Sequence, residues 1–361
     1  MGTVMADEED RVDTWNRQDD PSFRPYQIRE SMQTDQNPRL FKQISDVSDD
    51  FNMELEDDPG LDTPSEMSLS KQQKILFVCF HLPVVVVKSV NGEWKASWND
   101  SLLAQKEGSK IVATYRAHWI GTVTPVPPIT SDEDREAVRK ILAEMECTPI
   151  FLDPATKQAH YIGFCKQVLW PAFHNIDLLD LSASGLLHPG IESASDWDQS
   201  RLDHWWNAYQ TVNQIFADKV NELVDPESYL WIHDYHLSLL PRLLQAMEPG
   251  RSCRKVFFLH IPFPTSQIFR ELECGEAILE GMLHADVVGF HAFDHARHFL
   301  NAAKRILGLN YESLVGGLIG VNFKGKTVLV SMSNVSIEAR ILDGTSLLRM
   351  LGNYFLYRVF F

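Results

Sequence analysis

Two short apolar runs in this sequence each end at a histidine, followed by residue types that bind sugars or transfer protons. The run YLWIHDYH carries His233, Asp234 and His236, and the run KVFFLHIPFP carries His260. In an open parallel sheet, ligands bind just beyond the carboxyl ends of the strands. We therefore expect these four side chains at one edge of a sheet, and this edge is the best candidate for a site.

Three kinds of chemistry fit this group of residues. A carboxylate between two histidines offers acceptors and switchable donors that suit sugar hydroxyls or proton transfer. A metal site competes with this interpretation, but no glutamate or cysteine stands at a familiar zinc spacing. The histidines could also only satisfy backbone groups at strand ends. Two such motifs in one chain favour a ligand site, and we expect no metal ion and no cofactor.

A second group of histidines surrounds a predicted helix start and includes pairs three and four residues apart. Its members are His284, His291, His295 and His298. Their spacing permits metal binding, but Asp294 at the expected N-cap favours an ordinary helix start. We expect no site there.

The charge of the chain is unevenly distributed. Of the 361 residues, the first 70 hold 18 acidic and 6 basic side chains, which accounts for most of the net charge of -16. This segment is rich in polar residues and proline and shows no sustained period. We expect residues 1–70 to be a disordered acidic leader, because such a segment cannot bury enough apolar surface to offset its ordering entropy.

Other features bear on where the protein resides. The first residues are acidic, unlike a secretory signal. The longest apolar run, 75–87, contains His81 and Pro83 and is too short to span a bilayer. Five widely spaced cysteines without a CxxC pattern predict neither a disulfide framework nor a zinc site. We expect a cytoplasmic protein with neither a membrane nor a nucleic acid as partner.

From residue 71 onward the pattern alternates between strands and helices. Predicted strands cover 74–80, 109–121, 147–153, 229–233, 255–260 and 286–290, and predicted helices cover 130–146, 160–174, 196–224, 236–247, a segment ending near 284, and 294–308. This alternation predicts an α/β fold with a doubly wound parallel sheet. No GxGxxG follows the first strand, which disfavours a nucleotide-dependent oxidoreductase.

Four stretches together resemble one known family. QVLWPAFHN, WIHDYHLSLLP, FFLHIPFPTSQIFREL and DVVGFHAFDHARHFL are similar to the retaining glycosyltransferases of family 20, which make trehalose 6-phosphate from UDP-glucose and glucose 6-phosphate. The resemblance covers roughly residues 74–335 in the family's order of elements. GFCKQ, TVNQIFADKV and the long leader resemble the multidomain, regulatory-type branch, in which a synthase-like part precedes a phosphatase-like part.

The resemblance implies a GT-B fold, in which two Rossmann-like lobes face each other and the first lobe holds the acceptor. It assigns Tyr161 and Trp170 to the glucose 6-phosphate, Asp234 to the acceptor hydroxyls, and His260 to the transferred sugar. An indole face suits a pyranose ring and a phenol can donate to a phosphate oxygen. Trp170 fits equally well as a core tryptophan ahead of Pro171.

Three departures from the family pattern concern the acceptor site. His81, in FVCFHLP, stands where the family's SNRLP-like motif has an arginine. Arginine offers a permanent bidentate charge to phosphate, whereas histidine is only partly charged near neutral pH. Gly92 is the single remaining glycine of an expected pair, and Thr122 replaces a tryptophan. These departures therefore count against the binding of glucose 6-phosphate.

The resemblance also predicts how the chain divides. We expect an acceptor-binding lobe over residues 71–340 and an atypical apolar tail over 341–361, where the family would continue into its donor lobe. We expect a truncated or alternatively spliced product, which would bind UDP-glucose only if a donor lobe were supplied. On this expectation the isolated chain is inactive.

Two functional classes follow. The first is an enzyme of trehalose biosynthesis, an α,α-trehalose-phosphate synthase that transfers glucose from UDP-glucose with retention. The alternative is a non-catalytic regulatory or scaffold subunit of a trehalose synthase complex, which senses sugar phosphate. The family resemblance favours the first class, and His81 favours the second.

Overall fold

The computed structural model describes residues 74–99, 101, 115–176, 199–248, 250–314 and 319–333. All of them fall in the second of two units into which the chain divides, Thr63–Phe361. The predicted leader, 1–70, and the predicted tail, 341–361, lie outside the described residues.

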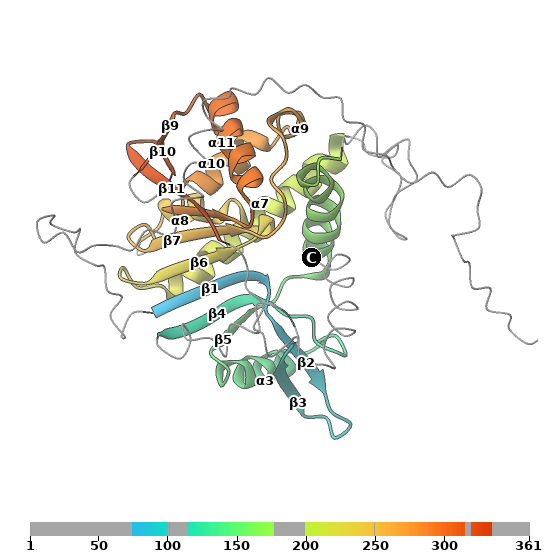
Figure 1. Ribbon diagram of the computed structural model, residues 1–361. Coiled ribbons are helices and arrows are strands. Elements are labelled where there is room, and N and C mark those ends of the chain that lie inside the picture. The colour runs from blue at the N-terminus through green and yellow to red at the C-terminus, as the bar shows by residue number, and fades with distance from the viewer. Residues whose placement is uncertain are drawn as a thin grey trace, which may run out of the picture. The chain divides into compact units, whose positions relative to one another are not determined.

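The described residues form one nine-stranded sheet and a separate two-stranded hairpin (Figure 1). Seven neighbouring strands of the large sheet run parallel, in the order β5-β4-β1-β6-β7-β8-β11. Their bounds are β1 Lys74–His81, β4 Arg116–Thr122, β5 Cys147–Ile150, β6 Tyr229–His233, β7 Arg254–Leu259, β8 Val287–Phe290 and β11 Lys326–Met332. The predicted parallel α/β sheet is therefore confirmed.

Two features of the strands were not predicted. Strands β10 (Ile319–Phe323) and β9 (Tyr311–Ser313) continue the sheet in antiparallel order, so that the sheet is mixed at this edge. Strands β2 (Val84–Lys88) and β3 (Trp94–Trp98) form an antiparallel hairpin directly after β1. Gly92 lies in the turn of this hairpin at φ +84°, a conformation that glycine adopts without steric cost.

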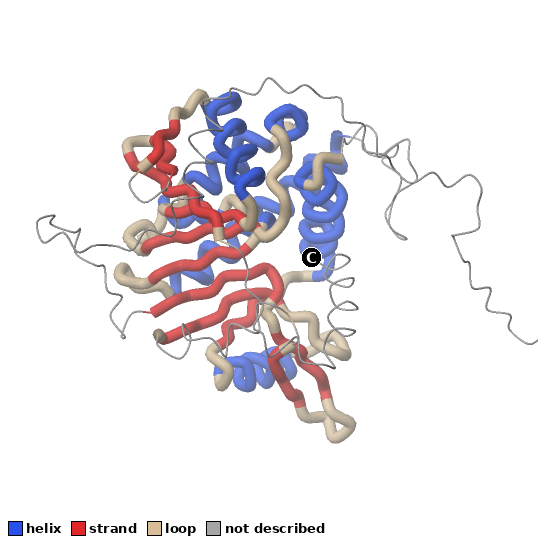
Figure 2. Tube along the Cα trace, in the orientation of Figure 1, coloured by secondary structure: helices blue, strands red, loops and turns tan. Residues whose placement is uncertain are grey.

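The helices cover the sheet and connect its strands, as Figure 2 shows in blue against the red strands. They are α3 Asp132–Ala143, α4 Pro154–Lys157, the π-helix η3 Gln158–Leu169, α5 Trp170–Phe173, α7 Gln199–Leu223, the 3₁₀ turn η5 Tyr235–Leu237, α8 Leu240–Gln245, α9 Ser266–Glu271, α10 Gly275–Leu283 and α11 Phe293–Leu307.

Two predicted helices are wrong in detail. The predicted helix over 236–247 is a 3₁₀ turn followed by α8, and Pro241 lies in the first turn of α8. Proline is tolerated there because the first amide groups of a helix have no partner within it. The predicted helix ending near residue 284 is two helices, α9 and α10.

Both faces of the central strand β1 are buried, which explains its continuous apolar run. Leu76, Val78 and Phe80 belong to a core shared with α7 and the π-helix. The alternate residues, such as Phe77, belong to a second core with α3 and the hairpin. Each such side chain contributes about 1.5–3 kcal/mol when it leaves water. These two cores fix the position of the carboxyl end of β1, where His81 lies.

Local sequence signals account for the starts of the helices. Ser131 is the N-cap of α3 and its side chain accepts a hydrogen bond from the backbone N–H of Asp134, as its residue type predicts. For α11 the N-cap is Ala292, and the predicted cap Asp294 lies in the first turn instead. Its negative charge still suits the helix dipole there. None of the helices within the described ranges combines the length and the apolar composition needed to cross a bilayer.

Candidate acceptor-binding site

The order of the strands reverses at β1. The chain runs outward from β1 to β4 and β5, and then returns to β6 on the other side of β1. Ligands of open α/β sheets bind at such a switch point, beyond the carboxyl ends of the strands. His81 ends β1 and His233 ends β6, while His260 and His291 directly follow β7 and β8. We call these four histidines, together with Asp234, the rim.

Three of these side chains are joined to one another, and we call them the histidine row. The distance from His233 Nδ1 to His260 Nε2 is 2.8 Å, and the distance from His260 Nδ1 to His291 Nε2 is 3.2 Å. A neutral imidazole has one donor and one acceptor nitrogen. When all three are neutral, the donors along the row must therefore point the same way. Both ring nitrogens of His260 then serve its neighbours.

His291 is a member of the rim that the sequence analysis did not identify. Its residue pattern was assigned to an ordinary helix start, and α11 does begin two residues later at Phe293. The signal was present, because DVVGFH repeats for a third time the arrangement of an apolar strand that ends at a histidine. Within the part of the chain that the structure describes, no group of three or more His, Cys, Asp or Glu side chains is arranged to hold a metal ion.

Asp234 lies at the centre of the rim, and its own backbone conformation is unusual. Its φ is +72° and its ψ is 166°, a backbone region that almost only glycine occupies. Holding any other residue in this conformation costs about 1–3 kcal/mol. Its N–H donates to the carbonyl of Phe258 at 2.8 Å, and its Oδ1 accepts the backbone N–H of His260 at 3.2 Å. These contacts fix the buried carboxylate between the ends of β6 and β7.

Burial also changes the acidity of Asp234. Loss of solvent raises its pKa to about 6, and the backbone N–H groups of Tyr235 and His260 and the charge of Lys166 limit this rise. The carboxyl is 6% exposed, so its charged form at neutral pH is costly. A sugar hydroxyl donating to this oxygen would relieve part of the cost.

The π-helix brings three further side chains together, which we call the aromatic–lysine group: Tyr161, Lys166 and Trp170. In a π-helix the hydrogen bonds run from residue i to i+5, so that Tyr161 and Lys166 are neighbours along the same side. Lys166 Nζ lies 4.3 Å from the ring centroid of Trp170 and 5.4 Å from that of Tyr161. Both distances are within the range of cation–π attraction.

Lys166 was not predicted as a site residue. It is half-buried, and its side chain forms no hydrogen bond or ion pair with any of the described residues. Burial lowers its pKa to about 8, against the opposing charge of Asp234. Burial likewise raises the pKa of Tyr161, so the phenol remains protonated at neutral pH.

His81 and Thr122, two of the departures from the family pattern, contact each other. The Thr122 hydroxyl donates to the carbonyl of Phe80 at 2.5 Å, and its oxygen lies 3.1 Å from His81 Nδ1. Burial and the charges of Lys157 and Lys166 lower the pKa of His81 to about 3. His81 is therefore neutral at physiological pH. Its ring edge meets the ring of Tyr161, with centroids 5.0 Å apart.

The structure places the remaining predicted residues as follows. Trp170 is half-buried, packs against the core and lies over His174 with centroids 4.2 Å apart, so it is both a core residue and an accessible one. His236 is buried and stacks on Tyr161 at 5.7 Å. Gly92 lies in the exposed hairpin turn. Of the predicted site residues, Asp234, His260, Tyr161, Trp170 and His81 belong to the rim or the aromatic–lysine group.

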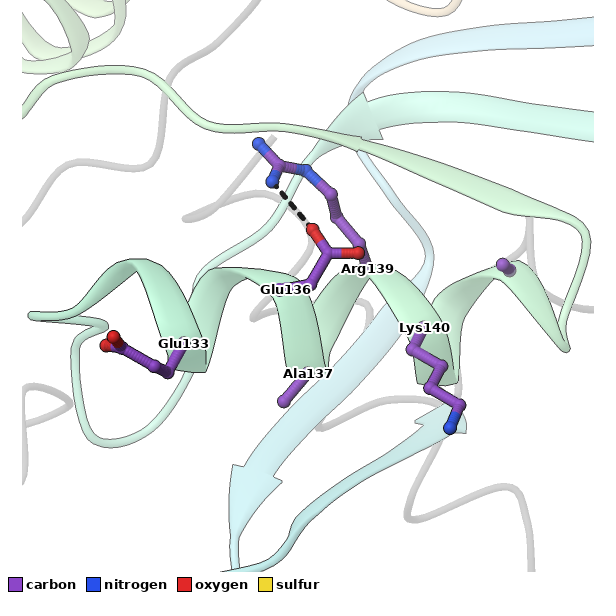
Figure 3. Close-up of a pocket in the computed structure, with 6 residues that line it drawn as sticks. Glu133, Glu136, Ala137, Arg139 and Lys140 are labelled. Atoms are coloured by element: carbon purple, nitrogen blue, oxygen red, sulfur yellow. Dashed lines mark hydrogen bonds and ion pairs between the residues drawn. The ribbon is translucent and has the colours of Figure 1, made fainter.

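A separate surface pocket on α3 has a different character. Its lining residues, Glu133, Glu136, Ala137, Arg139, Lys140 and Ala143, all come from one helix (Figure 3). Arg139 and Glu136 form an exposed ion pair at 3.1 Å. Such a pair at positions i and i+3 is typical of a solvated helix face. We therefore assign no ligand to this pocket.

The fold and the rim define the class of this protein: it has the Rossmann-like parallel sheet of a GT-B glycosyltransferase lobe. Solved structures with this fold include the N-terminal domain of a Candida albicans trehalose-6-phosphate phosphatase, with a TM-score of 0.55 and 27% identity over 74% of this chain and 50% of that one. A Burkholderia xenovorans α,α-trehalose-phosphate synthase, solved with glucose-6-phosphate, gives a TM-score of 0.51 and 22% identity over 72% and 49%.

Sequence comparison gives the family. The family model of glycosyltransferase family 20 matches residues 73–347, so the chain belongs to this family. The similar Arabidopsis thaliana proteins include a probable α,α-trehalose-phosphate synthase [UDP-forming] 9, 37% identical over 76% of this chain, and synthase 5, 36% identical over 82%. The chain spans only 30% and 31% of the lengths of these relatives. A Dictyostelium discoideum synthase A is 36% identical over 73% of this chain and 32% of its own length.

Proposed function

We propose that the described lobe is the acceptor-binding lobe of an α,α-trehalose-phosphate synthase and that it binds glucose 6-phosphate between Asp234 and the aromatic–lysine group. The observation that carries this proposal is Asp234. A buried carboxylate is fixed in a strained backbone at the switch point of the sheet. Its charge acts on Tyr161 and Lys166 of the aromatic–lysine group. The Burkholderia xenovorans relative with the same fold was solved with glucose-6-phosphate.

Each residue has a distinct task in this proposal. The Asp234 carboxylate accepts hydrogen bonds from the acceptor's hydroxyl groups, and the Trp170 ring covers the apolar face of the pyranose. Tyr161 remains protonated and can donate to an oxygen of the ligand. The family resemblance assigns the transferred sugar to His260, which is half-buried directly after β7.

The reaction itself requires a UDP-glucose donor, which the resemblance assigns to a second lobe. The bond between the anomeric carbon of glucose and the UDP oxygen breaks, and the anomeric hydroxyl oxygen of glucose 6-phosphate forms the new bond on the same face. The hydroxyl proton passes to the departing phosphate, so that UDP leaves and configuration is retained. Asp234 acts in this step by orienting the acceptor, which lowers the entropic part of the barrier.

A second function is favoured by one observation. His81 is neutral and occupies the position of a family arginine, so the lobe lacks a charge there that a catalytic acceptor site uses. On this reading the chain is a cytoplasmic regulatory or scaffold subunit of a trehalose synthase complex, which binds sugar phosphate without transferring glucose. Both functions require the rim to bind the acceptor, and they differ in whether transfer occurs.

Calorimetric titration of the 361-residue chain with glucose 6-phosphate tests the acceptor proposal. We expect saturable binding that Asp234→Ala weakens about ten- to a hundredfold, because hydrogen bonds to a charged group contribute about 1.5–3 kcal/mol. Absence of binding by the parent chain would reject the proposal. Release of UDP from UDP-glucose and glucose 6-phosphate would favour the enzyme over the regulatory subunit.

A further inference from the structure

The position that the family resemblance assigns to phosphate binding presents a lone pair to a ligand in this chain, where the family's arginine would present donors. The Thr122 hydroxyl has one proton and donates it to the carbonyl of Phe80, so in its contact with His81 Nδ1 the hydroxyl oxygen accepts. The proton of neutral His81 is therefore on Nδ1, and its Nε2 presents a lone pair. A lone pair repels a phosphate oxygen. The replacements at His81 and Thr122 thus act together to remove a donor.

Lys166 supplies what His81 lacks. Its ammonium is half-buried between the rings of Tyr161 and Trp170, the same two side chains that the acceptor proposal places around the sugar phosphate. Because it makes no hydrogen bond or ion pair among the described residues, its N–H donors are available to a ligand. The rings hold the charge in place without neutralising it.

We propose that Lys166 is the phosphate-binding residue of this lobe and that it determines the preference for a hexose phosphate over a free hexose. This inference rests on the proposed acceptor function and extends it to a residue that replaces the family arginine. An ammonium is a compact point charge that binds a phosphate oxygen through rotatable donors, in contrast to the bidentate fork of arginine. The site would therefore accept the phosphate with less fixed geometry.

The surroundings of Lys166 make this binding dependent on pH. Its pKa of about 8 means that the free protein loses the cation as pH rises through 8. The phosphate is a dianion above about pH 6. The affinity should therefore be greatest between about pH 6 and 8. The titratable groups around Lys166 are Tyr161 and Cys165 on the same helix, His81 on β1, and Asp234 and His236 after β6.

The test compares glucose 6-phosphate with glucose by calorimetric titration of the full chain at pH 7 and pH 9. We expect Lys166→Met, which keeps most of the apolar stem, to weaken glucose 6-phosphate binding about tenfold or more, while glucose binding changes less than about twofold. The parent should lose about tenfold in affinity for glucose 6-phosphate at pH 9. Lys166→Arg should restore binding and remove this pH dependence, because arginine stays charged.

Two further lysine variants serve as controls for the loss of positive charge at Lys166. Lys140→Gln removes an exposed lysine on α3 and should change neither affinity. Lys157→Gln removes the other lysine that influences His81, but Lys157 Nζ already donates to Thr124 Oγ1 at 2.9 Å, so we expect a smaller loss. Circular dichroism verifies that each variant is folded.

The possible failures are distinguishable. If the parent binds neither sugar, the acceptor function fails and this inference fails with it. If the parent binds glucose 6-phosphate and Lys166→Met binds it equally well, Lys166 is a packing residue and the inference alone is overturned. A large loss in Lys157→Gln with none in Lys166→Met would overturn it too and would assign the phosphate to Lys157.

Discussion

The histidine row and the aromatic–lysine group lie at the same end of the sheet, but their polar atoms are used in opposite ways. In the row, the ring nitrogens of His260 lie within hydrogen-bonding distance of His233 and His291. In the aromatic–lysine group, the ammonium of Lys166 faces two ring surfaces and donates no hydrogen bond to any of the described residues. The row therefore supports the strand ends, while the lysine can meet a charged ligand.

This difference shows how residue type can mislead. Histidines at strand ends are the conspicuous feature of the sequence, yet a side chain that binds its neighbours has less to offer a ligand. A single lysine in a helical segment is inconspicuous, because a lysine side chain is usually solvated. Its partners in space, which only the fold reveals, decide its role.

The largest expected effect is on the pH dependence of stability, and it comes from the carboxyl of Asp234. Because the pKa of Asp234 in the folded protein, about 6, is above its ordinary value of 3.8, this carboxyl stabilises the fold fully below pH 3.8. That contribution is lost as pH rises through 6. The asparagine of Asp234→Asn does not titrate. We therefore compare the free energy of unfolding of this variant with that of the parent at each pH. The variant's advantage should be larger at pH 8 than at pH 3.5, by on the order of 3 kcal/mol.

Urea denaturation at the two pH values measures this difference. Glu133→Gln, an exposed change on α3, is the control and should show no such trend. A pH-independent difference for Asp234→Asn would mean that the carboxyl is already stabilised in its charged form. In that case the contrast between a buried carboxylate that is costly to ionise and histidines that hydrogen-bond one another would disappear.

The second effect tests the packing that positions Lys166. A Cβ at Gly163 in the π-helix would lie 2.5–2.7 Å from the indole of Trp205 in α7, so one of the two helices must move. Gly163→Ala should therefore cost about 1–3 kcal/mol of stability and should weaken glucose 6-phosphate binding. Denaturation and titration together measure both effects. Weakened stability with unchanged binding would show that Lys166 does not depend on this contact.

The third effect separates backbone strain from side-chain chemistry at Asp234. Glycine and alanine both remove the carboxylate, but only glycine adopts φ +72° and ψ 166° without strain. We expect Asp234→Gly to be about 1–2 kcal/mol more stable than Asp234→Ala, while both bind glucose 6-phosphate equally weakly. Equal stability of the two variants in denaturation would argue against strain at this residue.

The smallest expected effect is at the end of the histidine row. His291→Ala removes one hydrogen bond to His260 and should cost about 0.5–1.5 kcal/mol of stability. Glucose 6-phosphate affinity should stay within about twofold of the parent. His298→Ala, which removes a contact of 3.0 Å to the carbonyl of Phe263 elsewhere, is the matched control. A tenfold loss of affinity in His291→Ala alone would give the row a direct part in binding.

How far the sequence predicts this fold depends on how local the physical signal is. Strands such as β1 and β7 are buried on both faces, so their continuous apolar runs are visible in the sequence. The hairpin strands β2 and β3 have mixed burial that is defined only by their partner, and they were missed. The same holds for the antiparallel edge formed by β9 and β10.

The residues of the candidate site also differ in how well the sequence predicts them. The strand-end rule was sufficient to bring Asp234 and His260 together, because the ends of neighbouring parallel strands must meet. It does not identify Lys166, because the α-helical repeat predicted for this segment separates Lys166 from Tyr161. At about 100° per residue, Tyr161 and Lys166 would point about 140° apart. Only the wider π-helical turn makes them neighbours.

The π-helix Gln158–Leu169 therefore makes this site sensitive to chain length as well as to residue type. Apart from the tightly packed Gly163, substitutions along this segment alter one side chain at a time and leave the others where they are. Deletion of a single residue of this helix outside 161–166 would instead let the helix relax to the α-helical repeat, in which Tyr161 and Lys166, still five positions apart, point about 140° away from each other. Among relatives of this chain, an alignment gap in these flanking parts of the helix would thus be a stronger sign of altered sugar-phosphate binding than most point differences.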